Sequence, residues 1–385
     1  MITAIVTIIV FLVLVSIHEF GHFIVAKSLG FGIMEYAIGF GPVLFKKEKK
    51  RILYSIRALP LGGYCKFTGD TEETENDPGA FNRQKLWKRF LVIVAGAVFN
   101  VILGFIIFII MVAFSSPIYT NTVDSVVEHS YLADAGIQAG DEIIRINGKK
   151  IDFYQDITLY TSSISSDSTI DVQVKRDGQK LDFQVKPSKR ETTANYKEDG
   201  LLVKSKMNGY SEEQFYPYDT ETNLKQEDKI GTAETTTRYL IGFVPQTEKV
   251  TPLNILPEAY YYTKFVVKLV YNSLWDMVRG AVSVDQLSGP VGVVNEVNNA
   301  VHSGSQSWLY VLNLVALLSI NLGVFNLLPI PALDGGRLLF LLIEWVRGKP
   351  IPPEKEGMVH GIGMLLLLLL IVLISFNDIM RLFGR

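Results

Sequence analysis

Four long apolar runs, separated by polar and charged segments, dominate the pattern of hydrophobic and polar positions along the chain. They cover Ile2 to about Ala26, Phe90–Phe114, Leu309 to about Leu328, and about Met358 to Phe376. Each run has about the 20 residues that an α-helix needs to cross a bilayer. The pattern therefore predicts a polytopic α-helical membrane protein with four transmembrane helices.

The polar stretches between these runs set the expected domain organisation. We expect a first span over 1–30, a connection over 31–89, a second span over 90–114, an outer domain over 115–250 with a polar insertion over 188–238, an amphipathic helix and linker over 251–307, a third span over 308–334, a second connection over 335–357, a fourth span over 358–376 and a tail over 377–385.

Basic residues in the two connections predict the orientation. The first connection carries Lys46, Lys47, Lys49, Lys50 and Arg51, and the second carries Arg337, Arg347, Lys349 and Lys355. Lys and Arg favour the cytoplasmic side, so both connections are predicted to be cytoplasmic. The N-terminus and the domain over 115–250 then face outside. The first run has no basic segment before it and no cleavage-site pattern after it, so we interpret it as a retained helix rather than a signal peptide.

Composition narrows the chemistry. The net charge is −2, which gives no indication of a nucleic-acid partner. Cys65 is the single cysteine, so an intrachain disulfide and a thiolate metal cluster are both excluded. Any bound metal must be held by His, Asp or Glu, and the chain has five histidines. We interpret His129 and His302 in the outer part as surface or core residues, since lone histidines seldom bind metal.

The segment His18-Glu19-Phe20-Gly21-His22 matches the pattern H-E-x-x-H inside the first span. Residues four apart share a helix face, so both imidazoles can reach one zinc ion, with Glu19 placed to take a proton from the water that zinc activates. The alternative is a pair of buried polar histidines with no metal. It is disfavoured because unpaired ionisable groups in an apolar span are costly.

A catalytic zinc usually has three protein ligands and one open position, and Asp334 is the best third ligand. It ends the segment Asn326-Leu327-Leu328-Pro329-Ile330-Pro331-Ala332-Leu333-Asp334, whose prolines interrupt the third span. The first and third spans run in the same direction, so His18, His22 and Asp334 should meet near the cytoplasmic side. The alternative for Asp334 is an interfacial cap or turn residue.

Short alternating runs between about Ile33 and Phe67 predict a β-hairpin around the charged turn Lys46–Lys50. Its edge could pair with an unwound substrate strand by β-augmentation. The alternative is a cytoplasmic hairpin that contacts only the bilayer surface.

The domain over 115–250 is predicted to be α+β and resembles PDZ. Ala135–Gly148 gives a turn, an alternating strand and an Asn-Gly turn, and further strands are predicted at Thr169–Val174, Leu181–Val185 and Tyr239–Val244, the last as the closing strand. The polar stretch over 188–238 is interpreted as an insertion or a mobile loop. Pro257–Gly280 is predicted to be an amphipathic helix, either on the outer membrane surface or packed on the outer domain.

Together, the segments His18–His22, Gly96–Asn100 and Asn326–Gly336 resemble the site-2 protease family, in its bacterial group with one PDZ domain. The resemblance covers most of the chain. It implies zinc bound by His18, His22 and Asp334, Glu19 as catalytic base, and a position in the bacterial cytoplasmic (inner) membrane. It also implies a membrane-re-entrant hairpin near the active site. Asn100 could contact a substrate backbone or only a neighbouring helix, and Asn321, Asn326, Gly63 and Tyr64 are further candidates for contact with the substrate or the transition state.

The expected reaction is hydrolysis of peptide bonds within transmembrane segments of single-span proteins, such as anti-sigma factors or remnant signal peptides. Expected partners are that substrate, the lipid bilayer and a peptide at the PDZ groove, with the chain as a monomer. A metal transporter would show internal repeats, and none is found. A PDZ scaffold without activity would have a broken H-E-x-x-H motif, and this one is complete.

Overall fold

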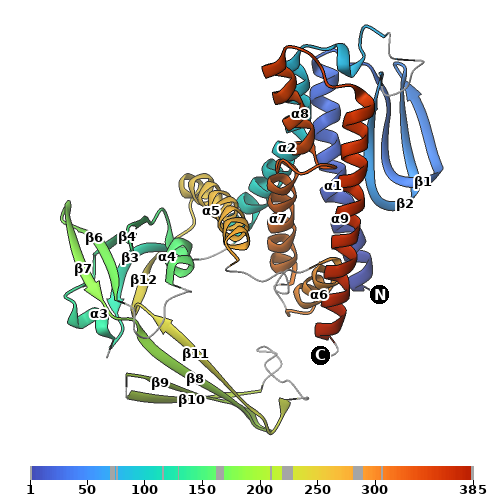
Figure 1. Ribbon diagram of the computed structural model, residues 1–385. Coiled ribbons are helices and arrows are strands. Elements are labelled where there is room, and N and C mark those ends of the chain that lie inside the picture. The colour runs from blue at the N-terminus through green and yellow to red at the C-terminus, as the bar shows by residue number, and fades with distance from the viewer. Residues whose placement is uncertain are drawn as a thin grey trace. The chain divides into compact units, whose positions relative to one another are not determined.

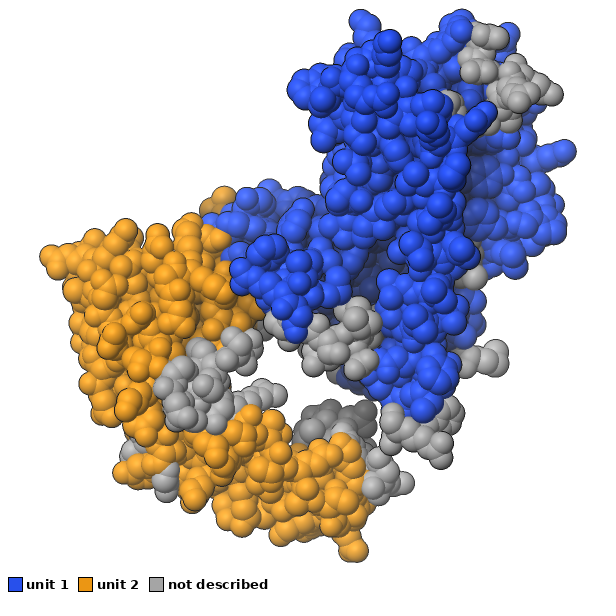
Figure 2. Space-filling view, in the orientation of Figure 1, with its two compact units in different colours: residues 1–111, 256–385 blue, residues 112–255 orange. Residues whose placement is uncertain are grey.

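The computed structural model describes residues 2–69, 74, 77–114, 117–128, 130–161, 169–208, 210–218, 229–280, 289–304 and 307–382. The chain divides into two compact units (Figure 2). One is formed by residues 1–111 and 256–385, and the other by residues 112–255.

Within the described residues, four helices of the first unit are long and apolar enough to cross a membrane, as the four predicted spans require (Figure 1). They are α1 (Ile2–Ser28), α2 (Leu86–Phe114), α7 (Ser307–Asn326) and α9 (Pro353–Leu382). Much of the α9 surface consists of exposed leucines, including Leu365, Leu366 and Leu369. Such a surface is stable against lipid but not against water.

Three further helices pack in this unit: α5 (Pro252–Val278), α6 (Pro290–Val301) and α8 (Asp334–Arg347). Ala259, Val266 and Val270 of α5 share a core cluster with Phe108 of α2 and Ile320 of α7. Part of the apolar face of α5 is therefore buried on two of the membrane helices, a packing that neither sequence-based alternative predicted. Helix α8 occupies the first part of the predicted second connection, and the sequence patterns did not indicate it.

The predicted hairpin is present as β1 (Ile33–Lys49) and β2 (Ile52–Phe67), which pair antiparallel. The predicted turn at Lys46–Lys50 is misplaced, because Lys46–Lys49 continue β1 and the turn lies at Lys50-Arg51. Its register is more complex than that of a simple hairpin. Tyr36 is paired with both Tyr54 and Cys65, and Ala37 with both Ser55 and Tyr64. The first part of β1 therefore lies between two parts of β2, and Gly39 and Gly62, both with positive φ, lie where the strands bend. The sheet lies beside α1 (Figure 1).

The second unit is built on a sheet with the order β12-β3-β4-β6-β7, and β5 pairs with β4. Its strands are β3 (Ile118–Val126), β4 (Glu142–Ile146), β5 (Lys149–Lys150), β6 (Ile170–Arg176), β7 (Gln179–Val185) and β12 (Phe243–Glu248), with helices α3 (Tyr131–Asp134) and α4 (Tyr154–Thr161). Alternate residues such as Val172, Val174 and Ile143 form the core. The predicted turn at Asn147-Gly148 has positive φ at both residues, as a tight hairpin requires.

Two predictions for this unit need correction. The polar stretch over 188–238 is not a mobile loop in its described part. It forms a four-stranded antiparallel sheet of β8 (Ser188–Tyr196), β9 (Gly200–Met207), β10 (Tyr210–Pro217) and β11 (Ala233–Leu240). The predicted closing strand Tyr239–Val244 is also wrong, because it is interrupted at Gly242, where φ is +94°. Its first residues belong to β11, and the strand that closes the main sheet is β12, paired with β3.

Candidate metal centre

Helices α1 and α2 cross so closely that only glycine fits at the crossing. A Cβ on Gly21 would lie 2.5 Å from the Ala95 carbonyl oxygen. A Cβ on Gly96 would lie 2.4 Å from His22 Nε2 and 2.8 Å from His18 Cε1. The two glycines therefore leave room for both imidazole rings between the helices, where His18 and His22 are buried.

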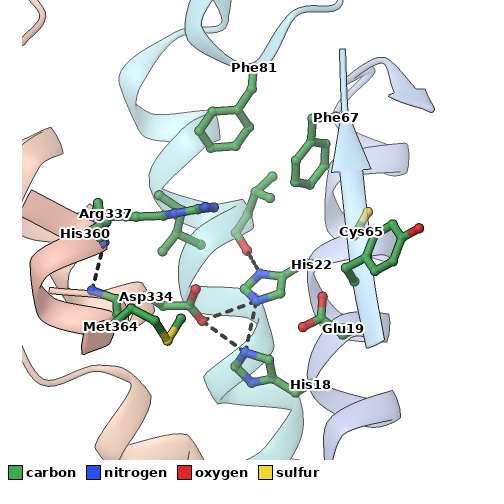
Figure 3. A pocket seen from close by; sticks show the side chains of 15 residues that line it. His18, Glu19, His22, Cys65, Phe67, Phe81, Asp334, Arg337, His360 and Met364 are labelled. Atoms are coloured by element: carbon green, nitrogen blue, oxygen red, sulfur yellow. Dashed lines mark hydrogen bonds and ion pairs between the residues drawn. The ribbon is translucent and has the colours of Figure 1, made fainter. Parts of the chain in front are cut away.

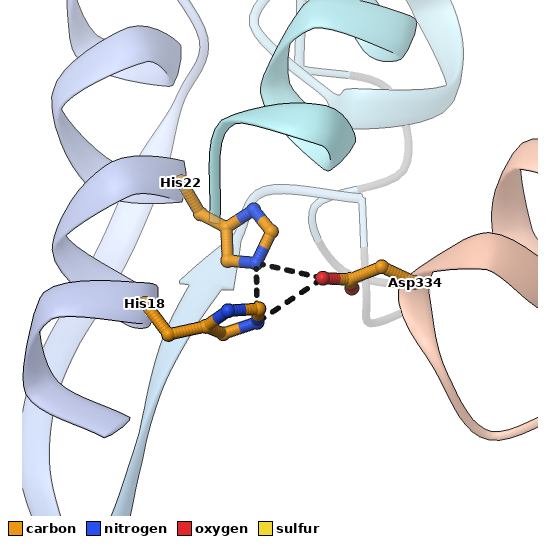
Figure 4. Close-up of side chains that lie close together, drawn as sticks. All are labelled: His18, His22 and Asp334. Carbon is orange, nitrogen blue, oxygen red and sulfur yellow. Dashed lines mark hydrogen bonds and ion pairs between the residues drawn. The ribbon is translucent and has the colours of Figure 1, made fainter. Parts of the chain in front are cut away.

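Asp334 reaches the same place from the other end of the chain. It is the first residue of α8 and follows the irregular segment after α7. A Cβ on Gly335 would lie 2.0 Å from the Leu328 carbonyl oxygen, and one on Gly336 would lie 2.6 Å from that of Ile330. The double glycine thus lets the segment fold back against the start of α8, which directs the Asp334 carboxylate toward α1 (Figure 4).

The three side chains form a nearly equilateral triangle of ligand atoms. Nε2 of His18 and Nε2 of His22 are 3.2 Å apart, and they lie 3.1 Å and 3.2 Å from Asp334 Oδ2. Zinc binds imidazole and carboxylate at about 2.0–2.1 Å, so ligand atoms at tetrahedral corners are about 3.3–3.4 Å apart. The donor set and its spacing therefore fit a tetrahedral zinc ion with one corner left open.

Neighbouring groups orient both imidazoles. His22 Nδ1 donates to the Val92 carbonyl oxygen at 2.8 Å, which leaves Nε2 free of hydrogen. His18 Nδ1 lies 3.3 Å from the side-chain amide of Asn100. The amide atom at that distance is Nδ2, whereas a metal-binding Nε2 requires the hydrogen on His18 Nδ1. Zinc binding at His18 therefore requires the Asn100 amide to turn, so that its oxygen accepts that hydrogen. The backbone carbonyl oxygen of Asn100 accepts a hydrogen bond from the Ser319 hydroxyl of α7 at 2.7 Å.

Glu19 lies beside the two histidines on the wall of a cavity of about 520 Å³ (Figure 3). The cavity is also lined by Tyr64, Cys65 and Phe67 of β2, Phe81, Val92 and Ile93 near the start of α2, Ala332, Asp334 and Arg337, and His360, Gly361 and Met364 of α9. Polar atoms that can hold a metal and move a proton thus meet in a cavity whose wall also includes apolar side chains such as Phe67, Phe81 and Ile93.

Of the other predicted site residues, some lie at the cavity and others do not. Tyr64 lines the cavity, and Gly63 lies at its side, where an added Cβ would be 3.5 Å from Glu19 Cγ. Asn100 has no exposed surface and contacts His18 rather than the cavity. Asn321 and Asn326 are half-buried in α7 and are not among the residues that line the cavity.

The two histidines that were predicted not to bind metal lie away from the site or outside the described residues. His302 is exposed and bonds to the Asn298 carbonyl oxygen. His129 lies outside the described residues.

The hydroxyl of Tyr64 is held by a small polar network in the hairpin. It donates to Glu35 Oε2 at 2.8 Å, and Ser55 and Arg57 donate to Glu35 Oε1 at 2.6 Å and 2.8 Å. Burial alone would raise the pKa of Glu35, but these three hydrogen bonds lower the pKa below its ordinary value. Glu35 thus remains ionised and fixes Tyr64 at the edge of the cavity.

Two residues that line the cavity, Arg337 and His360, were not predicted from motifs. A signal for His360 was nevertheless present in the sequence. It lies near the start of the fourth apolar run, and an ionisable side chain in such a run is itself an indication of function.

Two histidines and an aspartate that converge with tetrahedral spacing, a neighbouring glutamate and a cavity among apolar helices define the class as a metal-dependent hydrolase of the membrane. A model of peptidase family M50 matches residues 6–370, and the chain belongs to this family. It is therefore a zinc metalloprotease of the site-2 protease type.

Related proteins are similar in sequence to this chain over nearly its full length. A candidate zinc metalloprotease of Clostridium acetobutylicum is 33% identical over 378 residues, with 97% of this chain and 96% of the relative covered. The zinc metalloprotease RasP of Geobacillus kaustophilus is 29% identical over 455 residues, with 98% and 97% covered. The four apolar helices and these relatives indicate a protein of the bacterial inner membrane.

Proposed function

We propose that the chain cleaves peptide bonds within the transmembrane segments of single-span membrane proteins, with His18, His22 and Asp334 as the zinc ligands and Glu19 as the catalytic base. The observation that carries the proposal is the convergence of three ligand atoms within 3.2 Å of one another inside an apolar helix unit. We further propose that its substrates are anti-sigma factors or remnant signal peptides, cleaved in regulated intramembrane proteolysis.

Zinc, when bound, supplies a Lewis acid that polarises the scissile carbonyl and makes water a better nucleophile. Glu19 takes the proton of the attacking water and gives it to the leaving amine. Val92 and Asn100 hold the hydrogen on Nδ1 of each histidine, so that both Nε2 atoms keep their lone pairs. We assign Asn100 this orienting role in preference to contact with the substrate, because the residue has no exposed surface. Asn321 and Asn326 remain candidates for contact with the substrate.

A substrate helix must be extended before its peptide bonds can react, and we propose that the hairpin does this. Among the described strands, the segment Gly63–Phe67 is paired only with the first part of β1. Its Tyr64, Cys65 and Phe67 line the cavity, and Gly63 lies beside Glu19. An unwound substrate strand could add to the hairpin sheet beside this segment and enter the site by β-augmentation.

The second unit carries a groove that supports its proposed PDZ-like role. The groove lies between α4 and β12 and is lined by Tyr154, Ile157 and Thr158 of the helix and by Gly242, Phe243 and Val244 at the start of the strand. Among the strands that the structure describes, β12 pairs only with β3, so an extended peptide could pair with its other edge. We propose that this unit binds or filters substrates outside the cell. In this orientation the connections over 31–89 and 335–357 are cytoplasmic. We also propose that the chain is a monomer.

The test is cleavage of a tagged single-span substrate in liposomes by the wild type, by Glu19→Gln and by Glu296→Gln. Glu296 is an exposed carboxylate on α6 and provides the matched control. The expected result is cleavage by the wild type and the control, and a loss of about 10²–10⁴-fold for Glu19→Gln. Zinc content should be equal in all three proteins, because Glu19 is not a ligand.

Equal cleavage by the wild type and Glu19→Gln would refute Glu19 as the base. Loss of zinc from Glu19→Gln would instead show that this carboxylate contributes to metal binding. Cleavage outside the transmembrane segment, mapped by mass spectrometry of the products, would contradict the intramembrane assignment.

A further inference from the structure

Ala332, two residues before Asp334, has a backbone conformation that an alanine seldom adopts. Its φ is +78°, in the left-handed region, where an L-residue other than glycine is held only by its surroundings. One partner that holds it lies on another helix: the Ala332 N–H donates to His360 Nδ1 of α9 at 2.8 Å.

The rest of α9 is also fitted to this turn. A Cβ on Gly363, three residues after His360, would lie 2.4 Å from Pro331 Cβ and 2.7 Å from the Pro331 carbonyl oxygen. The α9 backbone therefore lies directly against the segment that leads to Asp334. The His360 ring also lies 5.4 Å from that of Phe340 on α8. Helix α9 thus contacts both the turn before Asp334 and the helix that begins with it.

The hydrogen bond also accounts for a histidine in an apolar helix. His360 lies in the candidate span over Glu354–Arg381, where an ionisable side chain is costly unless it has a partner. Nδ1 can accept from a backbone N–H only when it carries no hydrogen. In this geometry Nδ1 is occupied by Ala332 and is not available to a metal (Figure 3).

We infer that His360 is a positioning residue: through Nδ1 it holds the Ala332 turn, and thereby holds the Asp334 carboxylate where a metal ligand is needed. The inference rests on the proposed function, because it takes Asp334 as a ligand. It assigns to the fourth span a part in the active site that the ligand motifs do not include. Removing an outer-shell partner of a metal ligand typically weakens metal binding about 10–100-fold.

Variants of His360 with side chains of related shape test the hydrogen bond from the Ala332 N–H. In His360→Asn the amide oxygen occupies the place of Nδ1, whereas in His360→Gln it lies farther out, at the place of Nε2. His360→Leu removes the acceptor, and His302→Leu controls for loss of a histidine elsewhere. The zinc Kd is measured by chelator competition on the purified full chain in detergent, and the visible absorption of the cobalt-substituted protein reports ligand geometry.

The expected result is that His360→Leu and His360→Gln weaken zinc binding about 10–100-fold and change the cobalt spectrum. His360→Asn and His302→Leu should stay close to the wild type. Wild-type affinity in His360→Leu would overturn the inference. Equal losses in His360→Asn and His360→Gln would overturn it too, because they would indicate packing or direct ligation. If His360→Leu does not fold, the comparison of Asn with Gln decides.

Asp334→Ala, measured in parallel, separates this inference from the proposed function. If that variant binds zinc like the wild type, the proposed ligand set fails, whatever His360 does. If Asp334→Ala loses zinc while His360→Leu does not, only the positioning role fails.

Discussion

Gly96→Ala is the smallest change that should remove the metal from this protein. The added methyl carbon would lie 2.4 Å from His22 Nε2, 2.7 Å from His22 Cε1 and 2.8 Å from His18 Cε1. To restore an ordinary contact of 3.4 Å, the His22 ring would have to move by about 1 Å, several times the tolerance of about 0.2 Å in a metal–ligand bond.

The expected result is a zinc Kd raised by at least about 100-fold, the upper end of what a lost outer-shell partner costs, and loss of cleavage with it. The assay is zinc content by atomic emission after purification in detergent, followed by chelator competition. Gly104→Ala is the matched control on the same helix. Its methyl would lie 2.5 Å from Ile320 Cγ1 of α7, so it disturbs helix packing to a similar degree but not the ligands.

If the reasoning is correct, both variants lose some thermal stability, about 1–3 kcal/mol for an overpacked core, and only Gly96→Ala loses zinc. Retention of wild-type zinc affinity by Gly96→Ala would refute the steric argument. Equal zinc loss in Gly104→Ala would show that the metal site depends on helix packing in general, rather than on the space that Gly96 leaves for the ligands.

Three further predictions follow from particular contacts. Asp334→Ala should abolish zinc binding, and stoichiometric zinc in the purified variant would exclude this residue as a ligand. Arg89 of α2 donates to both carboxylate oxygens of Glu344 of α8 at 3.0 Å, and both side chains are largely buried. Arg89→Met should lower the free energy of unfolding by about 3–5 kcal/mol, and the double variant Arg89→Met/Glu344→Leu should recover most of the thermal stability. Equal stability of the single and double variants would count against a buried pair. In the second unit, burial alone would raise the pKa of Asp141, but hydrogen bonds from Arg176 and a backbone N–H lower the pKa below 3.8. The ionised carboxylate therefore stabilises the fold above that pH, and this stabilisation is lost as acid protonates it. Thermal midpoints between about pH 5 and about pH 3 should drop more in the wild type than in Asp141→Asn, and parallel curves would contradict the prediction.

The four spans, and the residues now proposed as ligands, could be predicted because each depends on a local pattern. A span is a run of apolar residues in one segment, and H-E-x-x-H places two imidazoles on one helix face by spacing alone. Asp334 needed one additional step, the common direction of the first and third spans. The structure brings His18, His22 and Asp334 together, as that argument predicted.

The sheet of β8–β11 was missed because its strands do not show a buried face. Polar residues such as Thr192, Thr193 and Lys204 occupy both faces of the sheet, so the strands do not alternate between an apolar and a polar face. Strand β10 is exposed along its length. Alternation of apolar and polar residues is the main sequence signal for a strand, and here it is weak. The closing strand was misplaced for a related reason: the apolar run Tyr239–Val244 is continuous in sequence, but Gly242 interrupts the strand through its positive φ.

The supports of the site could not be predicted, because each one is a backbone group or a contact between segments far apart in sequence. His22 bonds a carbonyl oxygen of Val92, 70 residues away. His360 bonds a backbone N–H at Ala332, and nothing in the side chain at 332 indicates that bond. A glycine such as Gly96 in a span is compatible with close approach of helices, but it does not indicate that the atoms approached are those of the histidine rings.

These supports have a common origin that explains why the site depends on the whole helix unit. The rings on α1 are oriented by Val92 and Asn100 of α2, and the turn that presents Asp334 is bonded to α9. Asn100 is tied in turn to Ser319 of α7. Every proposed ligand is therefore held by a helix other than its own, and the triangle of ligand atoms can form only when α1, α2, α7 and α9 are packed together. A change that breaks one of these supporting contacts should therefore reach the metal even when it touches no ligand, whereas a change elsewhere on the same helices, such as Gly104→Ala, should not.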